Sequence, residues 1–385
     1  MANRLVQINP ALVLGLAIAA LFLGSAAMLL LHAETWALGP ADGAALRFTL
    51  LQAALSALIA AVLAVPLARA LHRRRFAGRL LLTRLLAAPF VLPVVVAVLG
   101  IVTVFGRSGP LNAGLAALGL PPVSIFGLHG VVLANVFFNL PLATRMLLHG
   151  WQTIPAERFR LAASLSMPHS AQFRHLELPM LRAQIPGIVT TIFLICLGSF
   201  AIALTLGGGP KASTLELSIY QALRFDYDLG RAALLALIQF ALCAAVVVMA
   251  ARLTLRPGFG AGQDRVNVVP APGGVRRGFD VLVIVAAVLF LGAPVLAVIV
   301  KGVPGLATPP PGLWAATLRS LLVALASALL ASVAALTLAQ AAARKPALWV
   351  DIAAMLPLSA SGLVLGTGLF LMLHRWVTPA HLSLP

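Results

Sequence analysis

The chain alternates long apolar runs with short polar connections. Nine runs approach or exceed the length of about 20 residues that a helix needs to cross a bilayer. They lie near 11–32, 44–71, 81–106, 125–150, 183–206, 231–253, 279–301, 316–343 and 350–373. Because a helix satisfies its own backbone polar groups inside lipid, this pattern predicts an all-α polytopic membrane protein.

Composition strengthens this prediction. Hydrophobic residues make up 61% of the 385 positions and charged residues only 10%, whereas soluble domains carry about 25% charged residues. The formal net charge of +17 could suggest a nucleic-acid partner. Such a partner requires basic residues gathered on one face, and here they form short clusters between apolar runs. We therefore expect lipid, and no nucleic acid, around this chain.

The basic clusters also predict the orientation. They occupy the connections 72–84, 151–182 and 252–278, whereas the connections 33–43 and 302–315 contain no lysine or arginine. Basic connections stay in the cytoplasm, so we expect a cytoplasmic N-terminus. The first run is too long for the apolar region of a signal peptide and no cleavage pattern follows it, which predicts a retained anchor.

An internal repeat divides the chain. At an offset of 271 residues, segment 49–74 matches segment 320–345 at 13 of 26 positions. Six spans return the chain to its starting side, so the two copies are parallel. We predict a first repeat over 1–255, a cytoplasmic linker over 256–278 rich in glycine, proline and charge, and a second repeat over 279–385. Since the second copy holds only three spans, we expect it to be incomplete.

Several kinds of chemistry are not indicated. Neither the acidic residues nor the histidines lie at the centres of predicted spans, where an ion-coupled carrier or a metal site would need them. The glycine-rich segment 204–214 lacks the Gly-Lys-Ser/Thr of a phosphate loop. Cys196 and Cys243 lie inside apolar runs, as small hydrophobic residues do. We expect no catalysis, metal or cofactor, and an energy source in a partner protein.

One polar connection carries a recognisable motif. Segment 155–186 resembles the cytoplasmic coupling loop of ABC importer permeases, whose pattern is Glu-Ala-Ala, three residues, Gly, nine to ten residues, then Ile-x-Leu-Pro. The matched positions are Arg160 for the glutamate, Leu161 and Ala162 for the alanines, Ser166 for the glycine, Leu176 for the isoleucine, and Leu178 with Pro179 for the final pair. Arginine reverses the charge of the glutamate, and serine lacks the backbone freedom of glycine.

This resemblance implies a short helix, a turn and a second helix that docks into a groove of an ATPase subunit, over residues 155–182. Phe159, Ala162 and Ala163 then share a face on which small residues let another surface approach, and Arg160 can pair with acids beside the groove. An amphipathic loop lying at the lipid headgroups is the alternative.

Two further segments, 72–109 and 204–239, look like those of thiamine permeases. The resemblance implies the transmembrane subunit of an ABC importer in the bacterial inner membrane, moving thiamine or its phosphates by alternating access. Two copies of a separate ATPase and a periplasmic binding protein would be its partners, and the chain itself would not be an enzyme. Ferric-iron permeases share this plan and remain an alternative. A stand-alone secondary carrier and a structural or regulatory membrane protein are alternatives from other classes.

Two groups of polar residues are candidates for the substrate path. Asn135 and Asn139 lie four residues apart and so share one face of the fourth predicted span, where they serve either interhelical hydrogen bonding or substrate passage. A second group follows the fifth span and consists of Glu216, Asp226, Tyr227 and Asp228. These acids with a tyrosine would attract the cationic, aromatic thiamine, or form a solvated face, or contact a binding protein.

Overall fold

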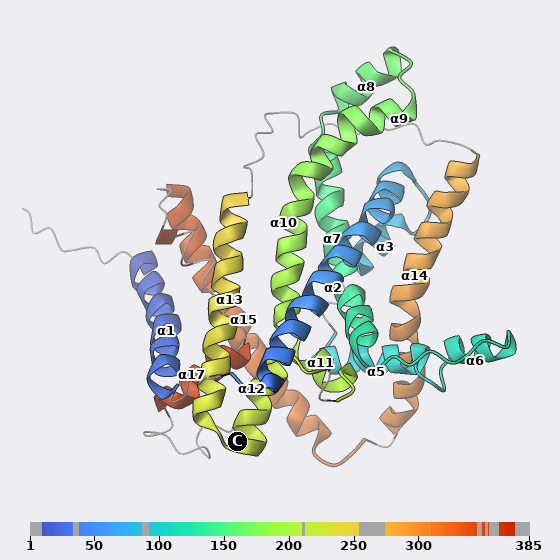
Figure 1. Ribbon diagram of the computed structural model, residues 1–385. Helices are drawn as coiled ribbons and strands as arrows, with labels where there is room; N and C mark the ends of the chain where they lie inside the picture. Colours follow the sequence, from blue (N-terminus) through green and yellow to red (C-terminus); the bar gives the residue numbers. More distant parts are fainter. Residues whose placement is uncertain are drawn as a thin grey trace, which may run out of the picture. The chain divides into compact units, whose positions relative to one another are not determined.

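The computed structural model describes residues 10–33, 38–86, 92–209, 212–253, 274–307, 309–344, 349–350, 353 and 362–373. Within these ranges the chain forms helices and no strands (Figure 1). Leucine and alanine, both strong helix formers, dominate the apolar segments. The prediction of an all-α polytopic membrane protein is confirmed.

The chain divides into two compact units. The first unit comprises residues 1–42, 215–247 and 302–385, and the second comprises 43–214 and 248–301. The helices of the first unit are α1 (Pro10–His32), α12 (Leu215–Gln221), η3 (Ala222–Asp226), most of α13 (Leu229–Leu253), η4 (Val303–Ala307), α15 (Leu313–Arg344) and α17 (Gly362–Leu373).

The second unit holds the longest continuous part of the chain. Its helices are α2 (Pro40–Arg73), α3 (Arg79–Leu85), α5 (Val94–Phe105), α6 (Pro110–Ala117), α7 (Leu128–Thr153), α8 (Ala156–Ser164), α9 (His169–Gln172), the π-helical η1 (Phe173–Glu177), α10 (Leu178–Leu197), α11 (Phe200–Leu206) and α14 (Val275–Gly302). The first residues of α2 belong to the first unit.

Eight helical stretches in the described ranges are long and apolar enough to cross a membrane. They correspond to the first eight predicted spans, and the sixth, for example, was expected over 231–253 and runs from Leu229 to Leu253. The ninth predicted span, 350–373, lies partly outside the described residues, and the part described as a helix is α17.

Two predicted spans are interrupted, so the prediction of single helices there was wrong. The run 81–106 contains α3 and α5 as separate helices, and Pro89 and Pro93 fall between them, where proline disfavours a continuing helix. The run 183–206 breaks between α10 and α11 at Gly198 and Ser199. The Ser199 hydroxyl donates to the Cys196 carbonyl over 2.9 Å, which offers the backbone an alternative to the helical bond.

Helix α7 forms the centre of the second unit. Most of its residues are buried, and the Phe137 ring contacts the rings of both Phe138 and Phe290. Helices α5 and α14 approach closely at Gly100, where a Cβ would lie 2.4 Å from the Pro294 carbonyl oxygen. Close backbone contact through a small residue is typical of helix packing in membranes.

Helices of the first unit also approach each other closely at a glycine. A Cβ added at Gly368 of α17 would lie 2.5 Å from the Ser25 Cβ of α1. A small apolar cluster of Leu338, Val350 and Ala353 packs against Leu14 and Ile18 of α1. These contacts join α1, α15 and α17 into one unit.

The predicted repeat boundaries stay a prediction. The two compact units combine segments from both predicted repeats, and most of the predicted linker, residues 256–278, lies outside the described residues. The end of α15 at Arg344 falls 271 residues after the end of α2 at Arg73, which is the offset of the sequence repeat.

Candidate functional site

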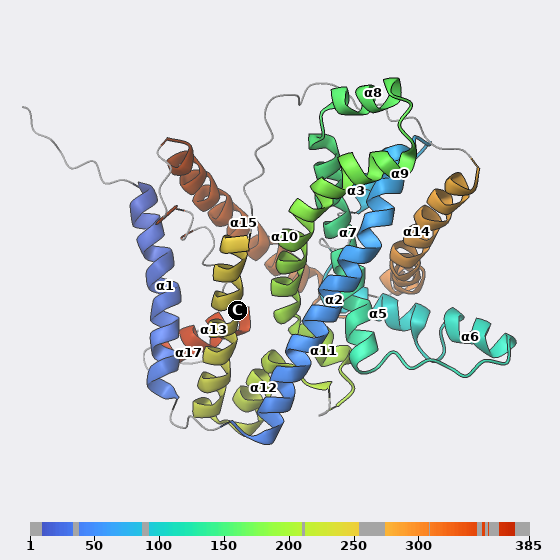
Figure 2. The ribbon, with the colours of Figure 1, turned by 45° about the horizontal axis from the view of Figure 1, so that its top comes forward.

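The segment predicted to be a coupling loop forms a helical hairpin. Helices α8 and α9 extend past the ends of α7 and α10 (Figures 1 and 2). Pro155 precedes α8 and Pro168 precedes α9, positions at which a missing backbone N–H costs nothing. Leu178 and Pro179 begin α10. The short helix, turn and second helix that the resemblance implied are therefore present.

The turn of the hairpin depends on Ser166. This residue has φ of +49°, in the left-handed region, where side chains other than that of glycine are disfavoured. Its amide donates to the Ala163 carbonyl over 3.0 Å, and the Met167 amide donates to the Ala162 carbonyl over 2.9 Å. This pair of bonds is a Schellman cap. The position matched to the family's glycine thus has the conformation that favours glycine.

The inner face of α8 packs on its own unit. Phe159 and Ala162 are buried, with the Phe159 ring 6.2 Å from the His72 ring, which in turn stacks on Trp151. The expectation that Phe159, Ala162 and Ala163 together face another protein was therefore wrong for the first two. Their aromatic and small side chains seat α8 on α2 and α7.

The outer face of α8 is exposed. It presents Arg160, Ala163 and two large apolar side chains, Leu161 at 62% exposure and Leu165 at 64%. Further along, Leu176 and Leu178 are half-buried and Pro179 is exposed. This outer face combines apolar surface with positive charge.

A buried carboxylate ties the hairpin to α2. Glu177, the last residue of η1, accepts hydrogen bonds from Arg69 at 2.6 and 3.1 Å and from Arg73 at 3.0 Å. The Arg69 guanidinium also lies 4.6 Å from the centre of the Phe173 ring. We call Arg69, Arg73 and Glu177 the clamp. Sequence reasoning missed it, although arginines four residues apart on one helix face were a usable signal.

A second ion pair fixes α14 to the same end of α2. The Arg74 guanidinium donates to the Asp280 carboxylate over 2.7 Å, and both side chains are largely buried. Three arginines within six residues at the end of α2, namely Arg69, Arg73 and Arg74, therefore bind carboxylates from two other segments of the unit.

Asn135 takes part in a buried polar network inside the second unit. Its side-chain amide donates to the Gln52 carbonyl over 2.8 Å, and the Gln52 amide donates to the Cys196 backbone carbonyl over 2.8 Å. That carbonyl lies beside the break between α10 and α11. The network joins α2, α7 and α10, so it supports the interhelical role rather than an open substrate path.

Asn139 lies one turn further along α7. Its amide donates to the Asn135 backbone carbonyl over 2.8 Å, and its side-chain oxygen is buried without a hydrogen-bond partner among the described residues. Cys196, next to it, is a buried free cysteine, as is Cys243, which agrees with their prediction as small hydrophobes.

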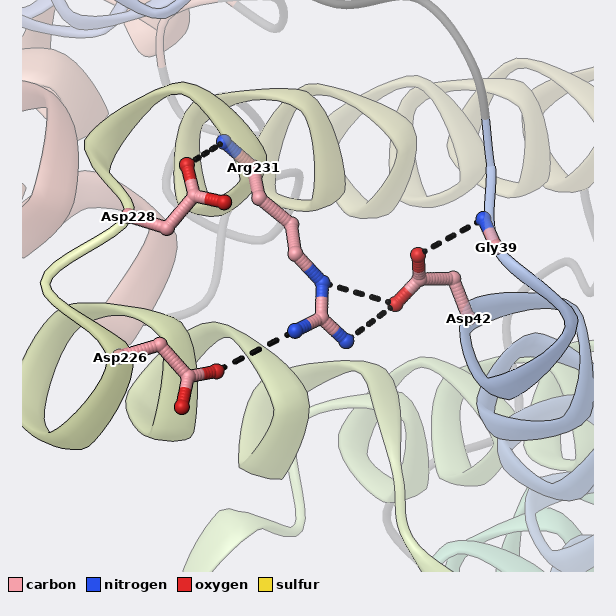
Figure 3. A network of polar contacts seen from close by, with 5 residues as sticks. All are labelled: Gly39, Asp42, Asp226, Asp228 and Arg231. Atoms are coloured by element: carbon pink, nitrogen blue, oxygen red, sulfur yellow. Dashed lines mark hydrogen bonds and ion pairs between the residues drawn. The ribbon is translucent and has the colours of Figure 1, made fainter.

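In the first unit, Arg231 binds three carboxylates (Figure 3). Its guanidinium donates to Asp42 over 2.8 and 3.2 Å and to Asp226 over 3.2 Å, and its backbone amide donates to Asp228 over 2.8 Å. Asp42 also accepts from the Gly39 amide. Sequence reasoning found Asp226 and Asp228 but missed Arg231 and Asp42, because their pairing spans 189 residues.

The expected acidic surface is therefore smaller than predicted. Glu216 is only 2% exposed on α12, whereas Tyr227 is 78% exposed in a left-handed turn after η3. Asp226 and Asp228 share one arginine. Three carboxylates against one guanidinium leave a net charge of −2, but Glu216 does not add to the open surface. Across the described ranges, no group of three potential metal ligands gathers.

Comparisons with known proteins find thiamine transport permeases. The thiamine transport system permease protein ThiP of Escherichia coli is 44% identical over 351 residues, which cover 86% of this chain and 64% of that protein. The protein of the same name from Haemophilus influenzae is 36% identical over 340 residues, covering 85% of this chain and 63% of its own length. Over most of its length, this chain is similar to thiamine transport permeases.

The homology reaches beyond that group at lower identity. The sulfate transport system permease protein CysW of Synechococcus elongatus is 28% identical over 217 residues, or 56% of this chain and 74% of that protein. No profile of a known protein family matches the chain. The chain spans a little under two thirds of the length of the thiamine permeases that it matches.

Proposed function

We propose that the chain acts as the transmembrane subunit of an ATP-driven importer of thiamine or its phosphates. The observation that carries this proposal is the similarity to relatives named as thiamine transport permeases over 86% of the chain. None of the relatives named above is an iron permease, so the ferric-iron alternative is not favoured. In this function the chain moves substrate by alternating access, and a partner ATPase hydrolyses the ATP.

The hairpin of α8 and α9 is the proposed contact with the ATPase. Its exposed side, with Arg160, Leu161, Ala163 and Leu165, offers an apolar surface with a positive charge, while Phe159 and Ala162 hold the helix on the permease. The clamp then passes movement of the hairpin to α2, because Glu177 is rigidly bound to Arg69 and Arg73. The segment that joins the hairpin to α10 contains Leu176, Leu178 and Pro179.

The proposed location is the bacterial inner membrane with the N-terminus in the cytoplasm. The basic connections and the hairpin then face the ATPase inside, and the Asp226–Tyr227–Asp228 turn faces a periplasmic binding protein outside. A cationic substrate passing this turn would meet the net negative charge of the Arg231 network.

Uptake measurements test the substrate. Deletion of the gene should abolish uptake of radiolabelled thiamine and leave uptake of radiolabelled ferric iron unchanged. Unchanged thiamine uptake would refute the proposed substrate, and a selective loss of iron uptake would favour the alternative permease class.

The energy source separates an importer from a stand-alone carrier. In membrane vesicles, uptake should require ATP inside and persist when a protonophore removes the proton gradient. Uptake that follows the gradient and ignores ATP would assign the chain to the secondary carriers.

Association with the ATPase tests the hairpin. Leu165→Asp places a charge on the outer face of α8, where burial in an interface costs several kcal/mol. We expect loss of co-purification with the ATPase and normal insertion in the membrane. Leu118→Asp is the control, since Leu118 follows α6 and is 76% exposed, compared with 64% for Leu165. Equal co-purification of both variants would exclude this face from the contact.

A further inference from the structure

A cavity of about 530 Å³ is lined by residues of α2, α9, η1 and α14. Figure 2 shows the ends of α2 and α14 that lie near α9. Arg69, Arg73 and Arg276 line the cavity, together with His169 and Ser170. Apolar side chains of Pro66, Phe173 and Phe279 complete the wall. The cavity belongs entirely to the second unit and is large enough for a small polar group.

The charge of this cavity is positive. Arg69, Arg73, Arg74 and Arg276 contribute four positive charges, and their partners Glu177 and Asp280 contribute two negative ones, which leaves +2. Arg276 makes no ion pair with any described residue, so its guanidinium is free to bind a ligand. A guanidinium binds phosphate oxygens with paired hydrogen bonds. The ligand that this charge favours is therefore a phosphate-bearing anion.

An apolar groove continues from the cavity along the same two helices. It has a volume of about 210 Å³ and is lined only by apolar residues, namely Leu63, Pro66, Leu67, Leu140, Val283, Ala286, Ala287 and Phe290. Pro66 lines both spaces. From Phe279 to Phe290 the helix rises about 16 Å, close to the thickness of about 15 Å of one leaflet of the hydrocarbon core.

We propose that the cavity and groove together bind one anionic phospholipid. The phosphate of the headgroup lies among Arg69, Arg73 and Arg276, and an acyl chain follows α14 through the groove. Basic pockets between transmembrane helices at the cytoplasmic side bind anionic headgroups in this manner. A soluble phosphate would use the arginines but gain nothing from the apolar groove. The site shares Arg69 and Arg73 with the clamp, but none of the exposed residues of α8 proposed for the ATPase contact lines it.

Lipid binding to the purified full chain tests the proposal. The chain is placed in nanodiscs of phosphatidylcholine, and retention of added phosphatidylglycerol is measured by native mass spectrometry. Arg276→Gln should weaken phosphatidylglycerol binding about fivefold, the effect of one basic residue near an anionic surface. Arg75→Gln is the matched control, because Arg75 is exposed beside α2 but does not line the cavity.

The groove has its own pair of variants. Ala286→Trp fills the groove from an exposed position of α14, whereas Val285→Trp adds the same bulk at the neighbouring exposed position outside the groove. Only the first should weaken phosphatidylglycerol binding. Equal effects of Arg276→Gln and Arg75→Gln would show diffuse surface charge and overturn the proposal. Displacement of the lipid by inorganic phosphate, with Ala286→Trp silent, would show a free-anion site and overturn it as well.

Discussion

Ser166 shows how one residue sets the shape of the proposed coupling hairpin. Its left-handed backbone conformation costs about 1–2 kcal/mol for a residue with a Cβ, and the two capping bonds to Ala162 and Ala163 compensate for part of it. A glycine avoids this steric cost and loses about 0.5–1 kcal/mol of backbone entropy. The steric term is the larger of the two.

We therefore expect Ser166→Gly to stabilise the turn by about 0.5–1 kcal/mol. Slower hydrogen exchange at the Met167 amide, which closes the cap, measures the gain. The control is Ser170→Gly. Ser170 lies in α9, where glycine is unfavourable, so the amides of α9 should exchange faster in this variant. Faster exchange at Met167 in the first variant would contradict the assignment of strain.

The buried ion pairs of Glu177 give a second prediction at the scale of a residue. Glu177→Gln leaves Arg69 and Arg73 without their buried counter-ion, so we expect a loss of about 3 kcal/mol in the free energy of unfolding. Denaturation in detergent measures it, with Glu157→Gln on the exposed side of α8 as the control, where an exposed pair contributes at most about 1 kcal/mol. Equal stability of the two variants would mean that the clamp does not hold the hairpin.

At the scale of elements, close approach of helices depends on glycine. Gly100→Ala places a Cβ against the Pro294 carbonyl oxygen, so α5 and α14 must separate. We expect a loss of about 1–3 kcal/mol, as for other overpacked sites. Gly292→Ala on α14 meets no atom within 4 Å and should be neutral or stabilising. Thermal unfolding of the two variants in detergent gives the comparison, and a neutral Gly100→Ala would contradict the packing.

The sequence patterns predicted the helices more accurately than the breaks within the predicted spans. The span at 231–253 was predicted within two residues of α13, because a run of leucine and alanine is unambiguous. The break at Gly198 and Ser199 was missed, because the two bonds to the Cys196 carbonyl, from Ser199 and from Gln52 on another helix, leave no periodic signal. The hairpin was found from its spacing, but the inward direction of Phe159 and Ala162 follows from packing on His72 and Trp151. Pairings across more than a hundred residues, such as Arg69 with Glu177, leave no periodic signal.

At the scale of the whole molecule, the predicted topology remains to be tested. Both cysteines are buried, so an introduced thiol can be labelled selectively. We expect a membrane-impermeant maleimide to label Ala113→Cys on α6 in intact cells, and to label Ser164→Cys on α8 only after the membrane is opened. Ala113 and Ser164 are both exposed, so access alone does not separate them. Labelling of Ser164→Cys in intact cells would reverse the orientation and remove the hairpin from the cytoplasm.

The π-helical turn of η1 has a mechanical consequence. It holds one residue more than an α-helical turn, so rewinding Phe173–Glu177 as α-helix would rotate the hairpin by about 100° around the axis of α10 and advance it by about 1.5 Å. The clamp opposes this rewinding, because Arg69 and Arg73 bind Glu177, the last residue of the turn. Deletion of Arg174 would remove the extra residue, so an α-helical turn would replace the π-helical one and the hairpin would keep its orientation. Spin labels at Ser164 and Thr190 should then report an unchanged distance, and a changed one would show that η1 does not hold one residue in excess.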